Sequence, residues 1–293
     1  MDEHQWLANQ FEENRPHLVA VAYRMLGSLS EADDAVQEAW LRLSRSDAGE
    51  IDNLGGWLTT VVARISLDML RSRSSRREDS LDDAPPVRPA PRSAAANPEQ
   101  EALLADSVGL ALLVVLDRLS PAERLAFVLH DLFDLSFDEI ASIVGRSPEA
   151  ARQLASRARR RVRGAEAPGA SLAQQREVID AFLAALRTGD LEALVAVLDP
   201  GLEVHADEVS ARAGAATAVH GAREWAAQAI RAAQGARLAR VVLVEGSIGV
   251  IVAPRGRLFR ALRFSISNGK IAAIDVIGDP EHLNRLELAV LED

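Results

Sequence analysis

The chain has 293 residues, 48% of them hydrophobic and 26% charged, which is enough material for two or three globular domains. It has no cysteine, which excludes disulfides, thiolate catalysis and cysteine–zinc sites, and neither a signal-peptide pattern nor an apolar run of about 18 residues, so we expect a cytoplasmic protein without a membrane span. The net charge of −10 argues against nucleic-acid binding by the chain as a whole. Local binding is still possible, because basic residues are clustered: six arginines and no acid lie in 152–163, and four arginines lie in 71–77.

Residues 1–77 have the pattern of a helical domain. In the second expected helix, apolar residues recur at i, i+3 and i+4, the spacing of a buried stripe. The expected elements are an apolar helical stretch from Pro16 to Gly27, a second helix with Ser30 as its N-cap, a chain break at Gly55-Gly56, and a third helix over 57–71.

The second helix is expected to carry an acidic outer face. With its apolar stripe turned inward, the residues on that face are Asp34, Gln37, Glu38 and Leu41. An exposed leucine among carboxylates suits docking onto a basic helix of another protein, and an ordinary solvated face is the alternative.

The third helix combines aromatic and basic side chains along one segment. Its candidate nucleic-acid contacts are Trp57, Arg64, Arg71 and Arg73. Aromatic stacking together with phosphate contacts would suit melted, single-stranded DNA. The next segment, 78–98, holds five of the chain's 12 prolines and almost no large apolar residues, which predicts a flexible linker.

Residues 99–165 are expected to be helical again and to end in a helix-turn-helix. Ser120-Pro121-Ala122-Glu123 has the pattern of a capping box. A short helix is predicted from Ser136 to Val144, a turn at Gly145-Arg146, and a second helix that begins at Ser147-Pro148 and continues to Arg163.

That second helix is the candidate DNA-recognition helix. Residues predicted to face inward are Ala151, Leu154, Ala155, Ala158 and Val162. The candidate contacts to base edges and phosphates on the outer side are Ser147, Glu149, Arg152, Gln153, Arg157 and Arg160. The alternative is an arginine-rich solvated helix. Lys270 is the only lysine of the chain, so arginine is used for nearly every basic position and its abundance in one helix is weaker evidence for DNA binding. The turn chemistry favours DNA recognition.

Residues 172–293 predict an α+β domain. Two helices, over 172–187 and 191–198, precede five strand-like runs. Those runs are 202–207, 238–245, 248–253, 258–267 and 271–277. Asn268-Gly269 is a strong hairpin signal, because both residue types tolerate positive φ, and an antiparallel sheet is therefore expected.

Three segments together resemble the extracytoplasmic-function (ECF) sigma factors: SEADDAVQEAWLRL at 30–43, GGWLTTVVARISLDMLRSRSSRRE at 55–78, and the helix-turn-helix segment 119–163. The resemblance implies region 2 over 1–77, linker 78–98, and region 4 over 99–165. It further implies that Asp34, Gln37 and Glu38 grip the β′ clamp helices of core RNA polymerase. By the same resemblance, region 4 meets the β flap, the helix from Trp57 opens the promoter −10 element, and the helix from Ser147 enters the −35 element.

The segment 172–293 resembles the SnoaL-like cone-shaped fold found in one ECF subgroup. In that subgroup a short Asn-Pro-Asp-Lys-Leu motif stands where this chain has Asp279-Pro280-Glu281-His282-Leu283. Asp279, Pro280 and Leu283 are therefore candidate regulatory residues, and the domain is expected to pack against regions 2 and 4 and hold them compact. A glycine-rich loop of the subgroup is replaced here by Asp207-Glu208-Val209-Ser210.

Two other functions are compatible with parts of the sequence. Relatives of the SnoaL-like fold include enzymes, and His205, Asp207, His220 and Asp275 are the possible acid–base residues. A pocket there could also hold an unidentified small ligand. An ordinary helix-turn-helix regulator is the remaining alternative, but it would not need the N-terminal half. We expect a multidomain promoter-specificity subunit with two helical domains and an α+β domain, and with no catalytic residue, cofactor or metal.

Overall fold

The computed structural model describes residues 3–46, 51–79, 109–164, 169–212 and 221–291. The chain divides into two compact units, which are described separately. Unit 1 comprises the described residues up to Asp79 together with Leu116–Arg159, and unit 2 comprises Gly109–Val115 and the described residues from Arg160 onward. Within the described ranges, no helix has the length and apolar character needed to cross a membrane.

The N-terminal part of unit 1 consists of three helices packed against one another: α1 (Glu3–Leu26), α2 (Leu29–Leu43) and α3 (Leu54–Asp79). Their apolar faces meet in a core whose fully buried side chains include Leu18, Met25, Leu43, Leu58 and Leu67. The predicted buried stripe of α2 is confirmed, since Ala32, Ala35, Val36 and Ala39 are all at most 1% exposed.

Two boundary predictions in this part were wrong. The N-cap of α2 is Ser28 rather than Ser30, and the two hydroxyl oxygens lie 3.0 Å apart. The Gly55-Gly56 pair does not break the chain but lies in the first turn of α3, where the Asn53 side chain accepts a hydrogen bond from the Gly56 amide at 3.0 Å.

The second part of unit 1 contains α6 (Pro121–Phe127), the π-helix η2 (Val128–Leu132), α7 (Phe137–Val144), and α8 (Pro148–Arg163) as far as Arg159. The capping box at Ser120 is confirmed: the Ser120 hydroxyl accepts from the Glu123 amide, and the Glu123 carboxylate accepts from the Ser120 amide. A shorter helix, α5 (Leu110–Leu116), begins in unit 2, and its last residue belongs to unit 1.

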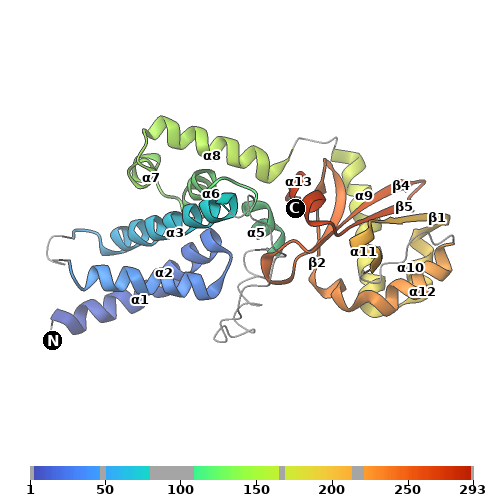
Figure 1. The fold of residues 1–293 in the computed structure, drawn as a ribbon, viewed down its shortest axis with the longest axis horizontal. Helices are drawn as coiled ribbons and strands as arrows, with labels where there is room; N and C mark the ends of the chain where they lie inside the picture. Colours follow the sequence, from blue (N-terminus) through green and yellow to red (C-terminus); the bar gives the residue numbers. More distant parts are fainter. Residues whose placement is uncertain (1–2, 47–50, 80–108, 165–168, 213–220, 292–293) are drawn as a thin grey trace. The chain divides into compact units, whose positions relative to one another are not determined.

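Unit 2 contains a six-stranded sheet (Figure 1). Its strands are β1 (Leu198–Ala206), β2 (Ala239–Val244), β3 (Ser247–Val252), β4 (Arg260–Ser267), β5 (Lys270–Ile277) and β6 (Leu288–Ala289). The strand order is β1-β5-β4-β3-β2-β6. Asn268 and Gly269 both have positive φ and form the predicted β4–β5 hairpin. The expectation of a wholly antiparallel sheet was wrong at one edge, because β1 pairs with β5 in parallel.

Helices cover one face of this sheet. These helices are α9 (Gly169–Thr188), α10 (Leu191–Val197) and α12 (Ala222–Ala232). Unit 2 also contains four shorter helical elements: α11 (Glu208–Arg212), η3 (Ala233–Leu238), η4 (Pro254–Gly256) and α13 (Pro280–Arg285). Phe182 is fully buried at the centre of this core, with its ring centroid 6.1 Å from that of Trp225 and 5.4 Å from that of Phe264. The predicted fold class, helical domains followed by an α+β domain, is confirmed.

Candidate functional site

The helix-turn-helix forms as the sequence predicts. A second capping box begins α7, where the Ser136 hydroxyl accepts from the Glu139 amide at 3.3 Å. Hydrogen bonds from the Ser136 hydroxyl and amide lower the pKa of Glu139. Gly145 ends the helix with φ 70° and ψ 43°, a left-handed conformation that glycine adopts without steric cost. The Ser147 hydroxyl then accepts from the Ala150 amide at 3.2 Å, which fixes the start of α8.

The two faces of α8 separate as expected. All five residues predicted to face inward are buried, with Val162 the most exposed of them at 6%. The predicted outer contacts are all exposed: Ser147, Glu149, Arg152, Gln153, Arg157 and Arg160. A buried apolar stripe opposite an exposed basic face is the arrangement by which a recognition helix enters a major groove.

Neighbouring groups orient the arginines of α8. Arg152 donates to the Glu149 carboxylate at 2.7 Å, and its guanidinium lies 5.1 Å from the ring centroid of Phe137. Arg157 pairs with Glu123 at 3.2 Å, and Arg159 pairs with Asp131. Arg152 is therefore held by the helix-turn-helix alone, whereas the other two arginines tie α8 to α6 and η2.

The acidic face of α2 is present. Asp34, Gln37 and Leu41 are exposed, the last at 40%, and Glu38 is half-buried and pairs with Arg42 at 3.0 Å. The structure therefore brings the four candidate core-binding residues together on one side of α2, with a large apolar side chain among them.

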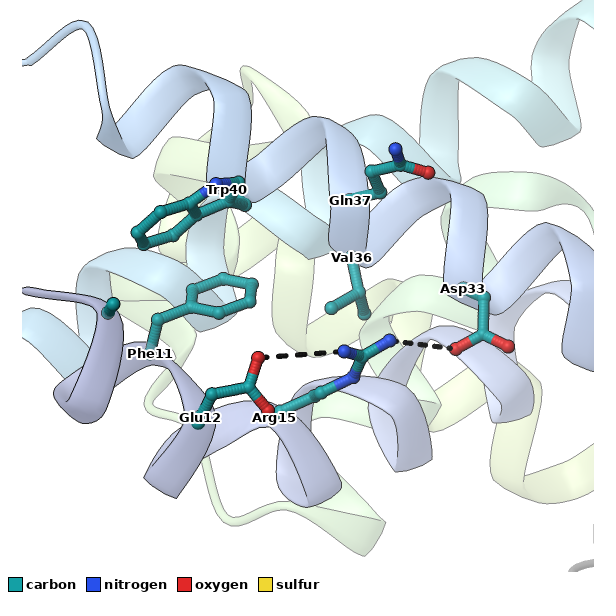
Figure 2. A pocket seen from close by; sticks show the side chains of 8 residues that line it. Phe11, Glu12, Arg15, Asp33, Val36, Gln37 and Trp40 are labelled. Carbon is teal, nitrogen blue, oxygen red and sulfur yellow. Dashed lines mark ion pairs between the residues drawn. The ribbon is translucent and has the colours of Figure 1, made fainter.

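A groove of about 350 Å³ between α1 and α2 adjoins this face (Figure 2). The Phe11 and Trp40 rings form its apolar wall, with centroids 5.0 Å apart. Along its rim, Arg15 lies 3.6 Å from the Glu12 carboxylate and 3.7 Å from that of Asp33. Gln37 lines the groove and also belongs to the acidic face, so the two features form one continuous surface.

The candidate contacts on α3 have different surroundings. Trp57 is half-buried, and Arg71 is exposed beside Asp68 at 3.8 Å. Arg64 is exposed but donates from Nη2 to the Ser142 carbonyl of α7 at 3.0 Å. Arg73 donates to the Leu26 carbonyl at 3.2 Å and pairs with Glu31, so it binds the end of α1.

In unit 2, Asp207 links two segments that the sequence analysis considered separately. Its carboxylate accepts from the Ser210, Gly278 and Asp279 amides, each at 2.7 Å. Partial burial raises the pKa of Asp207, but the amide hydrogen bonds outweigh it and lower the pKa to about 2. Asp279 in turn caps α13, whose Leu283 is buried at 4% exposure, whereas Pro280 is exposed.

The other residues considered for acid–base chemistry do not form a common site. The His205 imidazole lies 3.7 Å from the Glu203 carboxylate on the exposed side of β1. Asp275 pairs with Arg263 at 3.1 Å, and Asp207 is bound by backbone amides instead of His205. His220 lies outside the described residues. Among the described residues, no group of three or more His, Cys, Asp or Glu side chains could hold a metal ion.

The end of α8 and the sheet of unit 2 are in direct contact. The Val290 amide donates to the Val162 carbonyl at 2.7 Å. An added Cβ on Gly164 would lie 2.8 Å from the Ala289 Cβ and 3.4 Å from Leu243 Cδ1. The last turn of the candidate recognition helix therefore packs against the edge of the sheet formed by β2 and β6.

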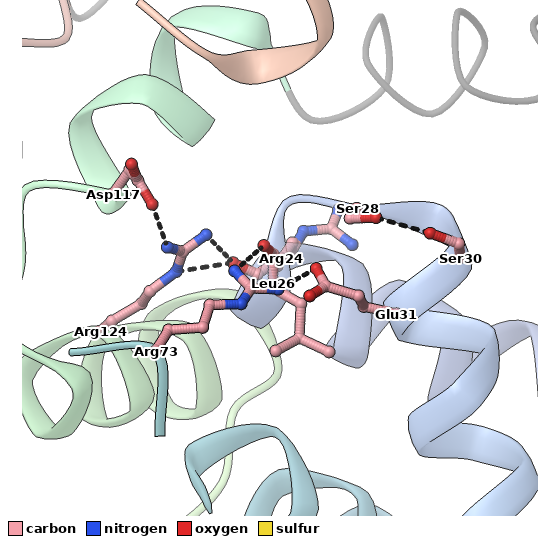
Figure 3. Close-up of polar contacts among 8 residues, drawn as sticks. All are labelled: Arg24, Leu26, Ser28, Ser30, Glu31, Arg73, Asp117 and Arg124. Atoms are coloured by element: carbon pink, nitrogen blue, oxygen red, sulfur yellow. Dashed lines mark hydrogen bonds and ion pairs between the residues drawn. The ribbon is translucent and has the colours of Figure 1, made fainter. Parts of the chain in front are cut away.

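Sequence reasoning missed the polar contacts at the C-terminal end of α1 (Figure 3). Arg124 of α6, with a side chain only 3% exposed, donates to the Arg24 carbonyl at this helix end. The position of Arg124 directly after the capping box does not indicate that it is buried. Its burial depends on the Arg24 carbonyl, which lies 100 residues earlier in the chain.

Comparison with known proteins identifies the family of the chain. Residues 10–76 match the family model for Sigma-70 region 2, and residues 109–162 match that for Sigma-70, region 4. The chain is 38% identical over 290 residues to the probable ECF RNA polymerase sigma factor SigI of Mycobacterium tuberculosis, covering 98% of both chains.

Two further comparisons concern SigJ. The chain is 36% identical over 289 residues to the ECF RNA polymerase sigma factor SigJ of Mycobacterium tuberculosis, covering 93% of this chain and 92% of the relative. Against the crystal structure of SigJ the TM-score is 0.44 with 31% identity, covering 94% of this chain and 97% of that chain.

Proposed function

Because the chain belongs to the ECF RNA polymerase sigma factors, which bind core RNA polymerase and promoter DNA, we propose a division of this work among its helices. The α2 face formed by Asp34, Gln37, Glu38 and Leu41 docks on the β′ clamp helices. Carboxylates that surround one exposed leucine fit a basic helix with an apolar contact at its centre. Region 4 meets the β flap.

DNA recognition falls to α3 and α8. Trp57, Arg64, Arg71 and Arg73 act on the −10 element, where a stacking side chain and cations suit separated strands. The exposed side of α8 reads the −35 element in the major groove. The observation that carries this proposal is the complete helix-turn-helix with its basic, exposed recognition face.

The function is tested by retention of core polymerase and by run-off transcription from a matched promoter. Leu41→Arg should lower retention about tenfold, because it places a cation at the centre of the docking face. Leu238→Arg is the matched control, since Leu238 is equally exposed, at 41%, but lies in unit 2. If the unaltered chain does not retain core polymerase, the assignment of these residues fails; equal retention by both variants would remove Leu41 from the interface.

We also propose that the C-terminal domain, which resembles the SnoaL-like fold, modulates this activity from the cytoplasm. Its support is the contact between α8 and the sheet edge, where Val290 donates to Val162. The Asp207 carboxylate bonds the backbone at Asp279, so the candidate regulatory segment is anchored within the same domain. A small ligand of this domain remains a proposal, and catalysis is not proposed, because the relatives are sigma factors rather than enzymes.

A further inference from the structure

Phe137 contacts a group on each of the elements beside it in the helix-turn-helix region. The His130 imidazole of η2 lies 4.0 Å from the Phe137 ring, measured between centroids. The Arg152 guanidinium of α8 lies over the same ring, 5.1 Å from its centroid. Phe137 is itself the first residue of α7, so this cluster of three side chains joins η2, α7 and α8.

The backbone holds the aromatic part of the cluster in place. The His130 Nδ1 lies 2.9 Å from the Leu135 carbonyl oxygen, and because a carbonyl oxygen only accepts, Nδ1 donates. The Asp134 amide donates to the His130 carbonyl at 3.2 Å. The capping box at Ser136 fixes the start of α7 directly before Phe137. The half-buried Phe137 ring therefore offers α8 a surface with little freedom to move.

Arg152 is restricted by this ring and by its neighbour on α8. Its Nη1 donates to the Glu149 carboxylate at 2.7 Å while its guanidinium lies against Phe137, although 56% of the side chain is exposed. An exposed arginine ordinarily loses rotamer freedom when it binds a partner. Two contacts already limit that freedom here, so less of it is lost on binding.

The same contacts leave the guanidinium able to bind a base. A guanidinium has five N–H donors, and the Glu149 carboxylate takes one of them. A contact with O6 and N7 of guanine needs two N–H donors in one plane. Arg152 lies in the N-terminal half of α8, and the N-terminal residues of a recognition helix are those that reach base edges.

The charge around Arg152 favours a base contact over a phosphate contact. Glu149 lies within hydrogen-bonding distance, so the pair presents little net charge to a phosphate several ångströms away. Attraction of phosphates depends on net positive charge and falls with salt. Base recognition depends instead on the direction of the donors, which Phe137 and Glu149 restrict.

We infer that Phe137 is a positioning residue for DNA recognition: it holds the Arg152 guanidinium in the orientation that reads one guanine of the −35 element. The inference rests on the proposed function, because it requires α8 to enter the major groove of that element. It adds a residue of α7, whose ring need not touch DNA, to those that determine promoter specificity. The competing explanation is that the ring only packs the helix-turn-helix together.

The test uses holoenzyme reconstituted from core RNA polymerase and the full chain. Promoter fragments with a randomised −35 segment are bound, and the bound fragments are sequenced to give the base preference at each position. Arg152→Ala should lower the preference for guanine at one position about tenfold, the usual scale of a bidentate arginine–guanine contact. Arg231→Ala, at an exposed arginine of unit 2, is the control and should change no position.

Phe137→Leu should lower the preference for that same guanine about two- to fivefold, the scale of a cation–π contact at an exposed site. The other positions and the salt dependence of binding should stay as in the unaltered chain. Phe137→Tyr should retain the preference, because a tyrosine ring also binds cations. If Phe137→Leu does not fold, as judged by circular dichroism, Phe137→Met takes its place, since methionine fills the space without a ring.

Phe133→Leu is the matched control, because it makes the same change at another half-buried ring of the region 4 segment. The Phe133 ring meets His17 edge-on at 5.2 Å between centroids and lies 5.1 Å from the Arg24 guanidinium, and both of these partners belong to α1. This variant should keep the guanine preference. A uniform loss at all positions in Phe137→Leu, or no loss at the guanine, overturns the inference.

Failure of the proposed function is recognised separately. If holoenzyme with the unaltered chain selects no −35 sequence, the proposed function fails and the inference fails with it. If it selects a sequence whose base preferences Arg152→Ala leaves unchanged, region 4 reads DNA without Arg152, and only the inference is overturned.

Discussion

Asp207 illustrates how one carboxylate can join distant parts of a domain. It follows β1, yet two of its three backbone donors belong to Gly278 and Asp279, which follow β5. Because the parallel pairing of β1 with β5 brings these strand ends to one edge, the carboxylate can bond both segments at once.

Asp207→Asn is expected to lower the free energy of unfolding of unit 2 by about 1 kcal/mol at pH 7, the usual scale for a carboxylate that accepts backbone amides. The pKa of Asp207 in the folded chain, about 2, lies below the ordinary value of 3.8. Its contribution is therefore complete above about pH 4 and is lost as the pH falls from about 4 towards 2. Calorimetry at pH 7 and pH 3 should show the difference between unaltered and variant chains shrinking at the lower pH. Asp199→Asn is the control, because its carboxylate accepts from the amide of Gly201, two residues away in the same strand.

Arg152 is the clearest single test of DNA recognition, since its partners lie within the helix-turn-helix itself. Arg152→Ala should weaken promoter binding by the polymerase holoenzyme by about 1–3 kcal/mol if the guanidinium contacts a base. A phosphate contact would instead lower the salt dependence of binding by about one unit of slope and affect all promoters alike. Titrations at several salt concentrations separate the two cases, with Arg231→Ala as the control; no effect would exclude Arg152 from the interface. Arg157→Ala is less clear, because it also breaks the pair with Glu123.

At the scale of elements, the turn between α7 and α8 depends on one glycine. Gly145 has φ 70°, and a Cβ built on it would meet no heavy atom within 4 Å. Gly145→Ala should therefore cost only backbone strain, about 1–2 kcal/mol of unfolding free energy in unit 1. Gly145→Asn should cost less, because asparagine tolerates this conformation. Thermal melts compare the two variants, and an equal loss would indicate crowding in place of strain.

Local patterns predicted most elements of the recognition site. The capping signals at Ser120 and Ser136, the glycine at position 145 and the buried stripe of α8 depend on residues within one or two turns of each other, and all of them formed. The same reasoning placed the hairpin at Asn268-Gly269.

Features that depend on distant contacts were not predictable in this way. The π-helix Val128–Leu132 had no recognised signal, and the parallel edge pairing of β1 depends on which strand lies beside it. The helix α12 and the short strand β6 had no recognised signal. Among site residues, the buried contact of Arg124 joins positions 100 residues apart, and no local pattern carries that information.

At the scale of the molecule, the region 4 segment is shared between both compact units. Gly109–Val115 and the end of α8 from Arg160 belong with the sheet, whereas Leu116–Arg159 belongs with the region 2 helices. The two ends of the region 4 segment therefore belong to the same compact unit as the C-terminal domain, which is the premise of the proposed modulation.

Gly164→Ala tests the proposed modulation directly. Gly164 has φ +72°, and a Cβ there would lie 2.8 Å from the Ala289 Cβ. The contact between α8 and the sheet should therefore weaken by at least about 1–2 kcal/mol, roughly a fivefold or greater change in its population. Gly189→Ala is the matched control, with φ +73° but its nearest neighbour at 3.7 Å. Run-off transcription at equal protein level should change in Gly164→Ala chains and in chains truncated after residue 168, in the same direction. Unchanged output in both would remove the C-terminal domain as a modulator.

The hydrogen bond from Val290 to Val162 also has a consequence during protein synthesis. Its two residues lie roughly 130 positions apart, so at about 5–20 residues per second on the order of 10 s pass between their addition at the ribosome. Throughout that interval the last turn of α8 lacks the residue that later donates a hydrogen bond to it. Each newly made molecule thus passes through a stage in which α8 precedes the sheet edge that it packs against, and the rate of translation sets how long that stage lasts.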